Sequence, residues 1–197
     1  MSKVRLYLVR HGKTMFNTIG RAQGWSDTPL TAEGELGIHE LGIGLRESGL
    51  QFDRAYSSDS GRTIQTMGII LEELGLQGKI PYRMDKRIRE WCFGSFDGAY
   101  DGDLFMGVIP RVFKVDHVHQ LSYAELAEGL VEVDTAGWAE GWEKLSGRIK
   151  EGFEAIAKEM EEQGGGNALV VSHGMTIGTI VYLINGMHPH GLDNGSV

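Results

Sequence analysis

The sequence predicts an α/β fold with a mostly parallel sheet that helices cover on both faces. Short β-branched and aliphatic runs alternate along the chain with segments of helical periodicity. Two of these runs, 4–9 and 167–172, end in a His-Gly pair. The length of 197 residues suits a single domain, 1–197, with a sizeable core.

The first half of the chain contains three expected strands and two expected helices. The strands are 4–9, 54–58 and 80–84, and the helices are 31–48 and 60–74. Thr31 is the expected N-cap of the first helix, and Gly75 ends the second. The first helix also contains Gly37, Gly42 and Gly44, each of which costs roughly 1 kcal/mol relative to alanine.

The second half begins with an irregular region and ends in regular structure. Glycine and proline interrupt the pattern from 94 to about 134, which indicates a loop-and-helix insertion, roughly 95–140, over a site. A long helix is expected over 136–163, with Trp138 and Trp142 packed in the core. The strand 167–172 and a helix to about residue 184 follow.

Composition excludes several classes of function. The net charge of -8 argues against nucleic acid or an anionic membrane as a partner. No apolar run reaches membrane-spanning length and no signal peptide precedes the first strand, so we expect a cytoplasmic protein. Cys92 is the only cysteine, which leaves no intrachain disulfide. The pairs His117/His119 and His188/His190 lack a third ligand nearby, so no metal site is expected.

Both His-Gly pairs follow expected strands. Because the carboxyl ends of parallel strands meet at one edge of a sheet, His11 and His173 are expected side by side, with Arg10 next to them. A helix begins at Gly174, and the free N–H groups at its start favour a bound phosphate.

Two further segments bring charged groups to the same edge. Arg62 lies in the first turn of an expected helix, where a cation is disfavoured unless an anion compensates it, so we expect an anionic partner. Glu90 is flanked by basic and bulky residues, surroundings that can hold a carboxyl group as a general acid.

Together these motifs resemble the histidine phosphatase superfamily, the phosphoglycerate mutase-like enzymes. The resemblance rests on Arg10-His11-Gly12 with Thr14 and Asn17, on 57–66 around Arg62, on Glu90 ahead of Phe93-Gly94 and Asp97-Gly98, and on Val171-Ser172-His173-Gly174. The motifs occur in the family's order. The resemblance implies a three-layer α/β/α sandwich, a phosphohistidine intermediate and no cofactor.

The resemblance also implies roles for five catalytic residues. His11 would be the nucleophile, Arg10, Arg62 and His173 would clamp the phosphoryl oxygens, and Glu90 would protonate the leaving alcohol. Phosphoryl transfer requires chiefly positioning and cations on these oxygens. We expect His11 to be neutral and His173 to be protonated, because the pair shares one phosphate.

Five residues are candidates for substrate binding. Asn17 would donate a hydrogen bond, Gln23 and Gly24 match a segment that approaches the substrate in the family, and Gly174 begins the helix at the phosphate. Arg21 is either an extra anion contact or plain surface charge.

The sequence therefore predicts a metal-independent phosphatase acting on a small phosphorylated substrate. The alternatives are a phosphoglycerate mutase-type transfer and a non-catalytic phospho-ligand-binding protein; a homodimer is also open. The short 95–140 region favours the phosphatase by resemblance, because mutases of this family usually carry longer insertions. The sequence ends at 194–197, where many members continue through another strand, so an edge strand beginning near Ser196 would be cut short.

Overall fold

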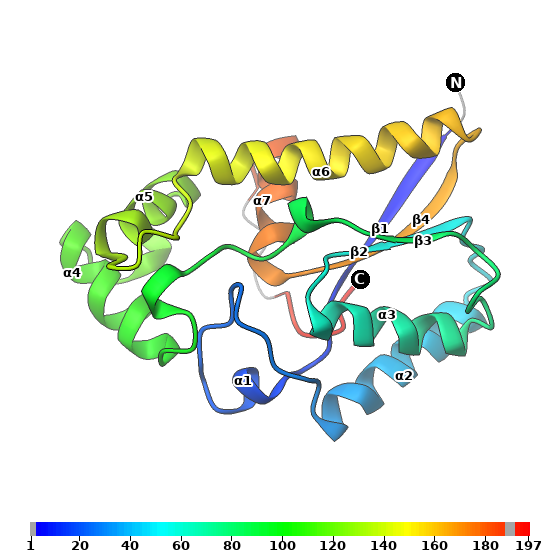
Figure 1. The fold of residues 1–197 in the computed structure, drawn as a ribbon, viewed down its shortest axis with the longest axis horizontal. Coiled ribbons are helices and arrows are strands. Elements are labelled where there is room, and N and C mark those ends of the chain that lie inside the picture. The colour runs from blue at the N-terminus through cyan, green and yellow to red at the C-terminus, as the bar shows by residue number, and fades with distance from the viewer. Residues whose placement is uncertain (1–2, 188–191) are drawn as a thin grey trace.

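A four-stranded parallel sheet forms the centre of the computed structural model, which describes residues 3–187 and 192–197 (Figure 1). Its strands, in the order β1-β4-β2-β3, are β1 (Val4–Arg10), β4 (Gly166–Ser172), β2 (Arg54–Ser57) and β3 (Tyr82–Met84). All three pairings are parallel, which confirms the α/β fold that the sequence predicts.

The register aligns the carboxyl ends of the strands. Arg10 of β1 pairs with Ser172 of β4, and Ser57 of β2 pairs with Val171. The residues that follow these positions therefore emerge together at one edge of the sheet, where ligands bind in open α/β folds.

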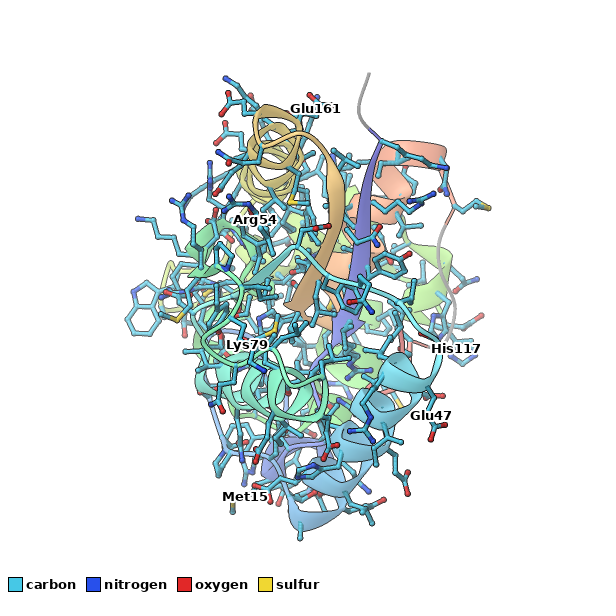
Figure 2. The ribbon with its side chains drawn as sticks, turned by 90° about the vertical axis from the view of Figure 1, so that its right-hand side faces the viewer. Met15, Glu47, Arg54, Lys79, His117 and Glu161 are labelled. Atoms are coloured by element: carbon cyan, nitrogen blue, oxygen red, sulfur yellow. The ribbon has the colours of Figure 1, made fainter. Side chains whose placement is uncertain are left out.

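Helices cover both faces of the sheet. On one face lie α2 (Ala32–Glu47) and α3 (Gly61–Glu73), and on the other lie α6 (Trp142–Glu162) and α7 (Gly174–Asn185). Figure 2 shows α6 above the strands and α2 below them. The alternation of side chains along β4 explains the two cores, because Ala168 and Val170 pack on the α6 side while Leu169 and Val171 pack on the α2 side.

The insertion is more helical than the glycines and prolines indicate. It contains a π-helix, η3 (Gly102–Val108), and the helices α4 (Ile109–Phe113) and α5 (Tyr123–Val133), at the left in Figure 1. Short 3₁₀ turns lie before and within it: η1 (Lys86–Ile88), η2 (Gly94–Phe96) and η4 (Val118–Gln120). A four-residue helix, α1 (Met15–Thr18), follows β1.

The start of the long helix α6 differs from the prediction. The helix begins at Trp142 rather than near 136, because Asp134 accepts hydrogen bonds from the backbone N–H groups of Ala136, Trp138 and Ala139 and holds them in a turn. The side chain of Trp138 is 70% exposed, so the prediction that it packs in the core is wrong. Trp142 does pack against the core.

The start of α2 and the outer edge of β1 bear on two of the sequence-based predictions. The hydroxyl of Thr31 accepts a hydrogen bond from Gly34 N at 3.0 Å, which confirms Thr31 as the N-cap. At the free edge of β1, Arg10 N donates to Ser196 O and Gly195 N donates to Arg10 O, both at 3.1 Å. The segment that contains Ser196 therefore pairs with β1 at its end. None of the helices in the described part of the chain has the length and apolar character needed to cross a membrane.

Candidate active site

His11 emerges from the end of β1 and is 3% exposed. Its Nδ1 lies 2.9 Å from Gly12 O. Because a carbonyl can only accept, Nδ1 carries the hydrogen and Nε2 keeps its lone pair. Burial, followed by the positive charge of Arg62, holds the pKa of His11 well below its usual range. His11 is therefore neutral, as the sequence predicts.

Gly12 fixes the carbonyl that orients this ring. Its N–H donates to the hydroxyl of Thr66 at 3.1 Å. A Cβ at this position would lie 2.7 Å from Cγ1 of Ile38, so glycine lets the chain that follows β1 pass this close to α2. Gly12 thus allows close packing against α2, and its carbonyl fixes the tautomer of His11.

His173 lies beside His11, with 5.3 Å between the ring centroids. Its Nδ1 accepts from Arg62 NH2 at 2.9 Å, and its Nε2 donates to Ser58 Oγ at 2.7 Å. Burial and then Arg62 hold the pKa of His173 well below its usual range. His173 is therefore neutral here, because a guanidinium faces Nδ1. The expected proton on His173 concerns a bound phosphate and stays a prediction.

Arg62 lies in the first turn of α3 and is fully buried. NH1 donates to Asp27 Oδ1 at 2.8 Å in an ion pair, and NH2 donates to Gly24 O at 2.8 Å. Asp27 is thus an anionic partner of the kind expected for a cation at a helix N-terminus. The carbonyls of Ser26 and Gln23 accept from the same guanidinium.

Arg10 and Arg62 each have one buried N–H group that donates no hydrogen bond within the described residues. Nε of Arg10 and Nε of Arg62 have no hydrogen-bond partner within the described residues. Arg10 NH1 donates to Leu192 O, and Gly174 packs closely on the Arg10 guanidinium. Buried donors in native proteins are nearly always paired, so these two atoms stand out, and Arg10 is the one of the two residues that also lines a cavity.

Glu90 is 6% exposed and is held by the start of α7. Its Oε1 accepts from the N–H groups of Trp91 and Thr176, both at 3.0 Å, and its Oε2 accepts from Met175 N at 3.2 Å. Arg148 donates to the backbone carbonyls of Arg89 and Glu90, which fixes the segment from the α6 side. The carboxyl group is therefore rigidly placed in the site.

A cavity of about 390 Å³ lies in front of His11. Its lining includes side chains from the sheet edge, from the loop after β1 and from the insertion: Arg10, His11, Asn17, Arg21, Gln23, Glu90, Phe93, Asp101, Phe105, Tyr123, Gly174, Met175 and Leu192. Arg62 and His173 lie behind His11, buried in the protein. Three of the five predicted catalytic residues thus line the cavity, and the other two adjoin them, because Arg62 contacts His173 and His173 lies beside His11.

The predicted binding residues occupy different positions. Asn17 accepts from Thr14 N through Oδ1 at 3.1 Å, which leaves its Nδ2 group to donate. Gln23 lines the cavity, but its amide already accepts from Thr14 Oγ1 and donates to Thr28 Oγ1. Gly24 is outside the cavity lining and contributes the carbonyl that accepts from Arg62.

Arg21 and Gly174 both lie on the cavity wall. The guanidinium of Arg21 lies over the ring of Tyr100, 4.5 Å from its centroid, and donates to Gly98 O. Arg21 is therefore held at the cavity wall, and its role as an anion contact stays a prediction.

Sequence reasoning missed several residues of the site. Asp27 lies in the loop that contains Gln23 and Gly24. A carboxylate in this loop was the signal that could have identified it as the partner of Arg62. Asp101, Phe105 and Tyr123 come from the insertion, where no motif marked them. Asn194, from the C-terminal segment, donates to His11 O at 3.1 Å.

The sequence contains two histidine pairs that are candidate metal ligands, His117/His119 and His188/His190. Within residues 3–187 and 192–197, no three His, Cys, Asp or Glu side chains are grouped so that they could hold a metal ion, and this includes His117 and His119. The pair His188 and His190 lies outside the described residues.

Comparisons with known proteins agree on one family. The family model of the histidine phosphatase superfamily (branch 1) matches residues 6–197. A protein named probable phosphoglycerate mutase GpmB, from Salmonella choleraesuis, is 32% identical over 186 residues, which cover 93% of this chain and 76% of that protein.

Solved structures share the fold. The crystal structure of a phosphoglycerate mutase from Bacillus anthracis has a TM-score of 0.93 and 36% identity, with 100% of this chain and 87% of that chain covered. The alpha-ribazole phosphatase from Shigella flexneri has a TM-score of 0.66 and 25% identity, with 92% and 80% covered. Fold, family model and relatives lead to the same conclusion: the chain belongs to the histidine phosphatase superfamily.

Proposed function

We propose that this chain is a metal-independent phosphatase that hydrolyses a phosphate monoester through a phosphohistidine intermediate on His11. The observation that carries the proposal is the pair of buried, unpartnered Nε donors of Arg10 and Arg62, within the described residues, beside a neutral histidine. Two guanidinium groups supply the positive charge that equatorial phosphoryl oxygens require. An imidazole with a free Nε2 lone pair supplies the nucleophile.

In the first step, Nε2 of His11 attacks phosphorus and the ester P–O bond breaks. The leaving oxygen takes a proton from Glu90. Oε2 is the atom to which we assign this proton, because it accepts one backbone N–H where Oε1 accepts two. Arg10 and Arg62 stabilise the charge on the phosphoryl oxygens throughout.

In the second step, water attacks the phosphohistidine. Glu90, now a carboxylate, accepts a proton from the water as its oxygen bonds to phosphorus. The N–P bond breaks, its electron pair returns to Nε2, and inorganic phosphate leaves. His11 is again neutral and Glu90 again carries its proton, so the cycle closes.

A mutase is the second candidate, and the names of the Salmonella and Bacillus relatives favour it. A mutase would return the phosphoryl group to another hydroxyl of the same molecule. Such a protein would need a bisphosphate primer and would release no net phosphate.

Phosphate release from phenyl phosphate, in the presence of EDTA, tests the proposal. We expect release by the wild type, loss of at least about 10³-fold in His11→Ala, and an unchanged rate in His119→Ala, an exposed histidine outside the cavity. Mass spectrometry after alkaline quenching should detect one added phosphoryl group in the wild type. A rate that is lost with EDTA and restored by a divalent metal would contradict the metal-independent mechanism, and isomerisation after priming would favour the mutase.

A further inference from the structure

Asp101 places a carboxylate on the cavity wall that the catalytic cycle does not use. Its backbone N–H donates to Gly20 O at 2.9 Å, which ties the start of η3 to the loop after α1. The side chain does not cap η3, and it forms no hydrogen bond or ion pair within the described residues. The carboxylate is half-buried, so it faces the cavity without a local partner.

Two arginines share the cavity wall with Asp101. Arg10 belongs to the phosphoryl-binding end, beside His11. Arg21 is stacked on Tyr100 and is held by Gly98 O. Burial raises the pKa of Asp101, while the charge of Arg10 lowers it. The leaving group of a bound substrate would therefore meet Asp101, whose carboxylate has no hydrogen-bond partner in the described part of the chain, and two arginines that backbone carbonyls already hold.

Part of the cavity wall is apolar. Phe93, Phe105 and Met175 line the cavity, and the rings of Phe93 and Phe105 meet edge to face with centroids 5.6 Å apart. Such a surface suits a leaving group with apolar or aromatic area. These three side chains carry no charge that could pair with a carboxylate or with a second phosphate.

We propose that Asp101 selects substrates by charge, so that this site accepts phosphate monoesters of uncharged or cationic alcohols with an apolar or aromatic part and rejects those whose leaving group is an anion. The inference rests on the proposed phosphatase activity and names its substrate class. The physical reason is the repulsion between like charges in a partly buried cavity, where water screens them weakly. Phosphorylated sugar acids, the substrates of a mutase, fall in the rejected class.

A matched substrate series tests the role of Asp101. Phenyl phosphate, 4-carboxyphenyl phosphate and 4-(aminomethyl)phenyl phosphate share one ring and differ in charge. Values of kcat/KM are measured for the wild type, for Asp101→Asn and for Asp103→Asn, which removes an exposed charge two residues away and outside the cavity. Burial raises the pKa of Asp101 while Arg10 lowers it, so the assays are run at pH 8, where the carboxylate is ionised.

For the wild type and Asp103→Asn we expect kcat/KM for the carboxylate substrate to be about tenfold below that for phenyl phosphate. In Asp101→Asn the values of kcat/KM for these two substrates should differ by no more than about threefold, and the value for phenyl phosphate should change little from the wild type. An unchanged ratio in Asp101→Asn, or an equal loss in Asp103→Asn, would overturn the assignment.

A binding measurement separates this inference from the phosphatase proposal. Dissociation constants of benzylphosphonate and 4-carboxybenzylphosphonate, which cannot be hydrolysed at the P–C bond, are measured by calorimetry for the same three proteins. A charge preference that Asp101→Asn removes would support the role of Asp101 even if no ester were turned over. Absence of turnover with all three esters would count against the phosphatase alone, and equal binding of both phosphonates by the wild type would count against Asp101.

Discussion

Arg62 is the residue on which the geometry of the site depends most, because it contacts both the second histidine and the loop after β1. It donates to His173 through NH2 and to Asp27 through NH1. A buried guanidinium needs a carboxylate and several acceptors to offset its desolvation. Asp27 and the carbonyls of Gln23, Gly24 and Ser26 provide them, while Nε has no hydrogen-bond partner within the described residues.

Replacing Asp27 with Asn tests this dependence. The change keeps the shape but removes the charge that compensates Arg62. Since the Asp27 side chain is 36% exposed, we expect a loss of about 2 kcal/mol in the free energy of unfolding, measured by urea denaturation. The value of kcat/KM should fall about tenfold or more because Arg62 is no longer held.

The control is the surface ion pair between Lys13 and Glu33. Glu33→Gln should change the free energy of unfolding by less than about 1 kcal/mol. Equal effects of the two variants would contradict the special role of Asp27.

At the scale of elements, the helices α2 and α3 pack closely through a glycine. A Cβ at Gly42 would lie 2.6 Å from Cβ of Glu73 on α3. Gly44, on the same helix, is exposed and has no neighbouring atom within 4 Å of such a Cβ within the described residues. The glycine at 42 is therefore explained by packing, while nothing in the structure explains those at 37 and 44.

Alanine at these two glycines should have opposite effects. Gly44→Ala should stabilise the protein by roughly 0.5–1 kcal/mol, because alanine is the better helix former and meets no neighbour. Gly42→Ala should destabilise it by about 1–3 kcal/mol, because α3 must move away. Thermal and urea unfolding of the two variants measure the difference. Stabilisation by both changes would show that α2 and α3 separate without cost.

At the scale of the whole molecule, the buried histidines couple the active site to global stability. The folded protein holds the pKa values of His11 and His173 well below the ordinary value of 6.5. Below about pH 6.5 the unfolded chain therefore binds protons that the folded chain does not bind. This favours unfolding, so stability is lost as the pH falls from about 7.

Each of the two histidines should contribute roughly 1 kcal/mol to this loss between pH 7.5 and pH 5.5. The free energy of unfolding, measured in urea at both pH values, should therefore fall less in His11→Asn than in the wild type. His119→Asn, at an exposed position, is the matched control and should behave as the wild type does. The same pH dependence in wild type and His11→Asn would mean that His11 titrates normally in the folded protein.

Local sequence determined most of the fold and the identity of the reacting groups. Hydrophobic runs, the Thr31 cap and the His-Gly pairs act over a few neighbours, so they predicted the strands, the parallel sheet and the meeting of His11 with His173. Tertiary contacts decided the rest. The charge of His173 follows from Arg62, and the exposure of Trp138 follows from the turn that Asp134 holds. Asp101 reaches the cavity only because the insertion folds over the sheet edge. Protonation, burial and cavity lining depend on partners distant in sequence, and no short-range pattern can encode them.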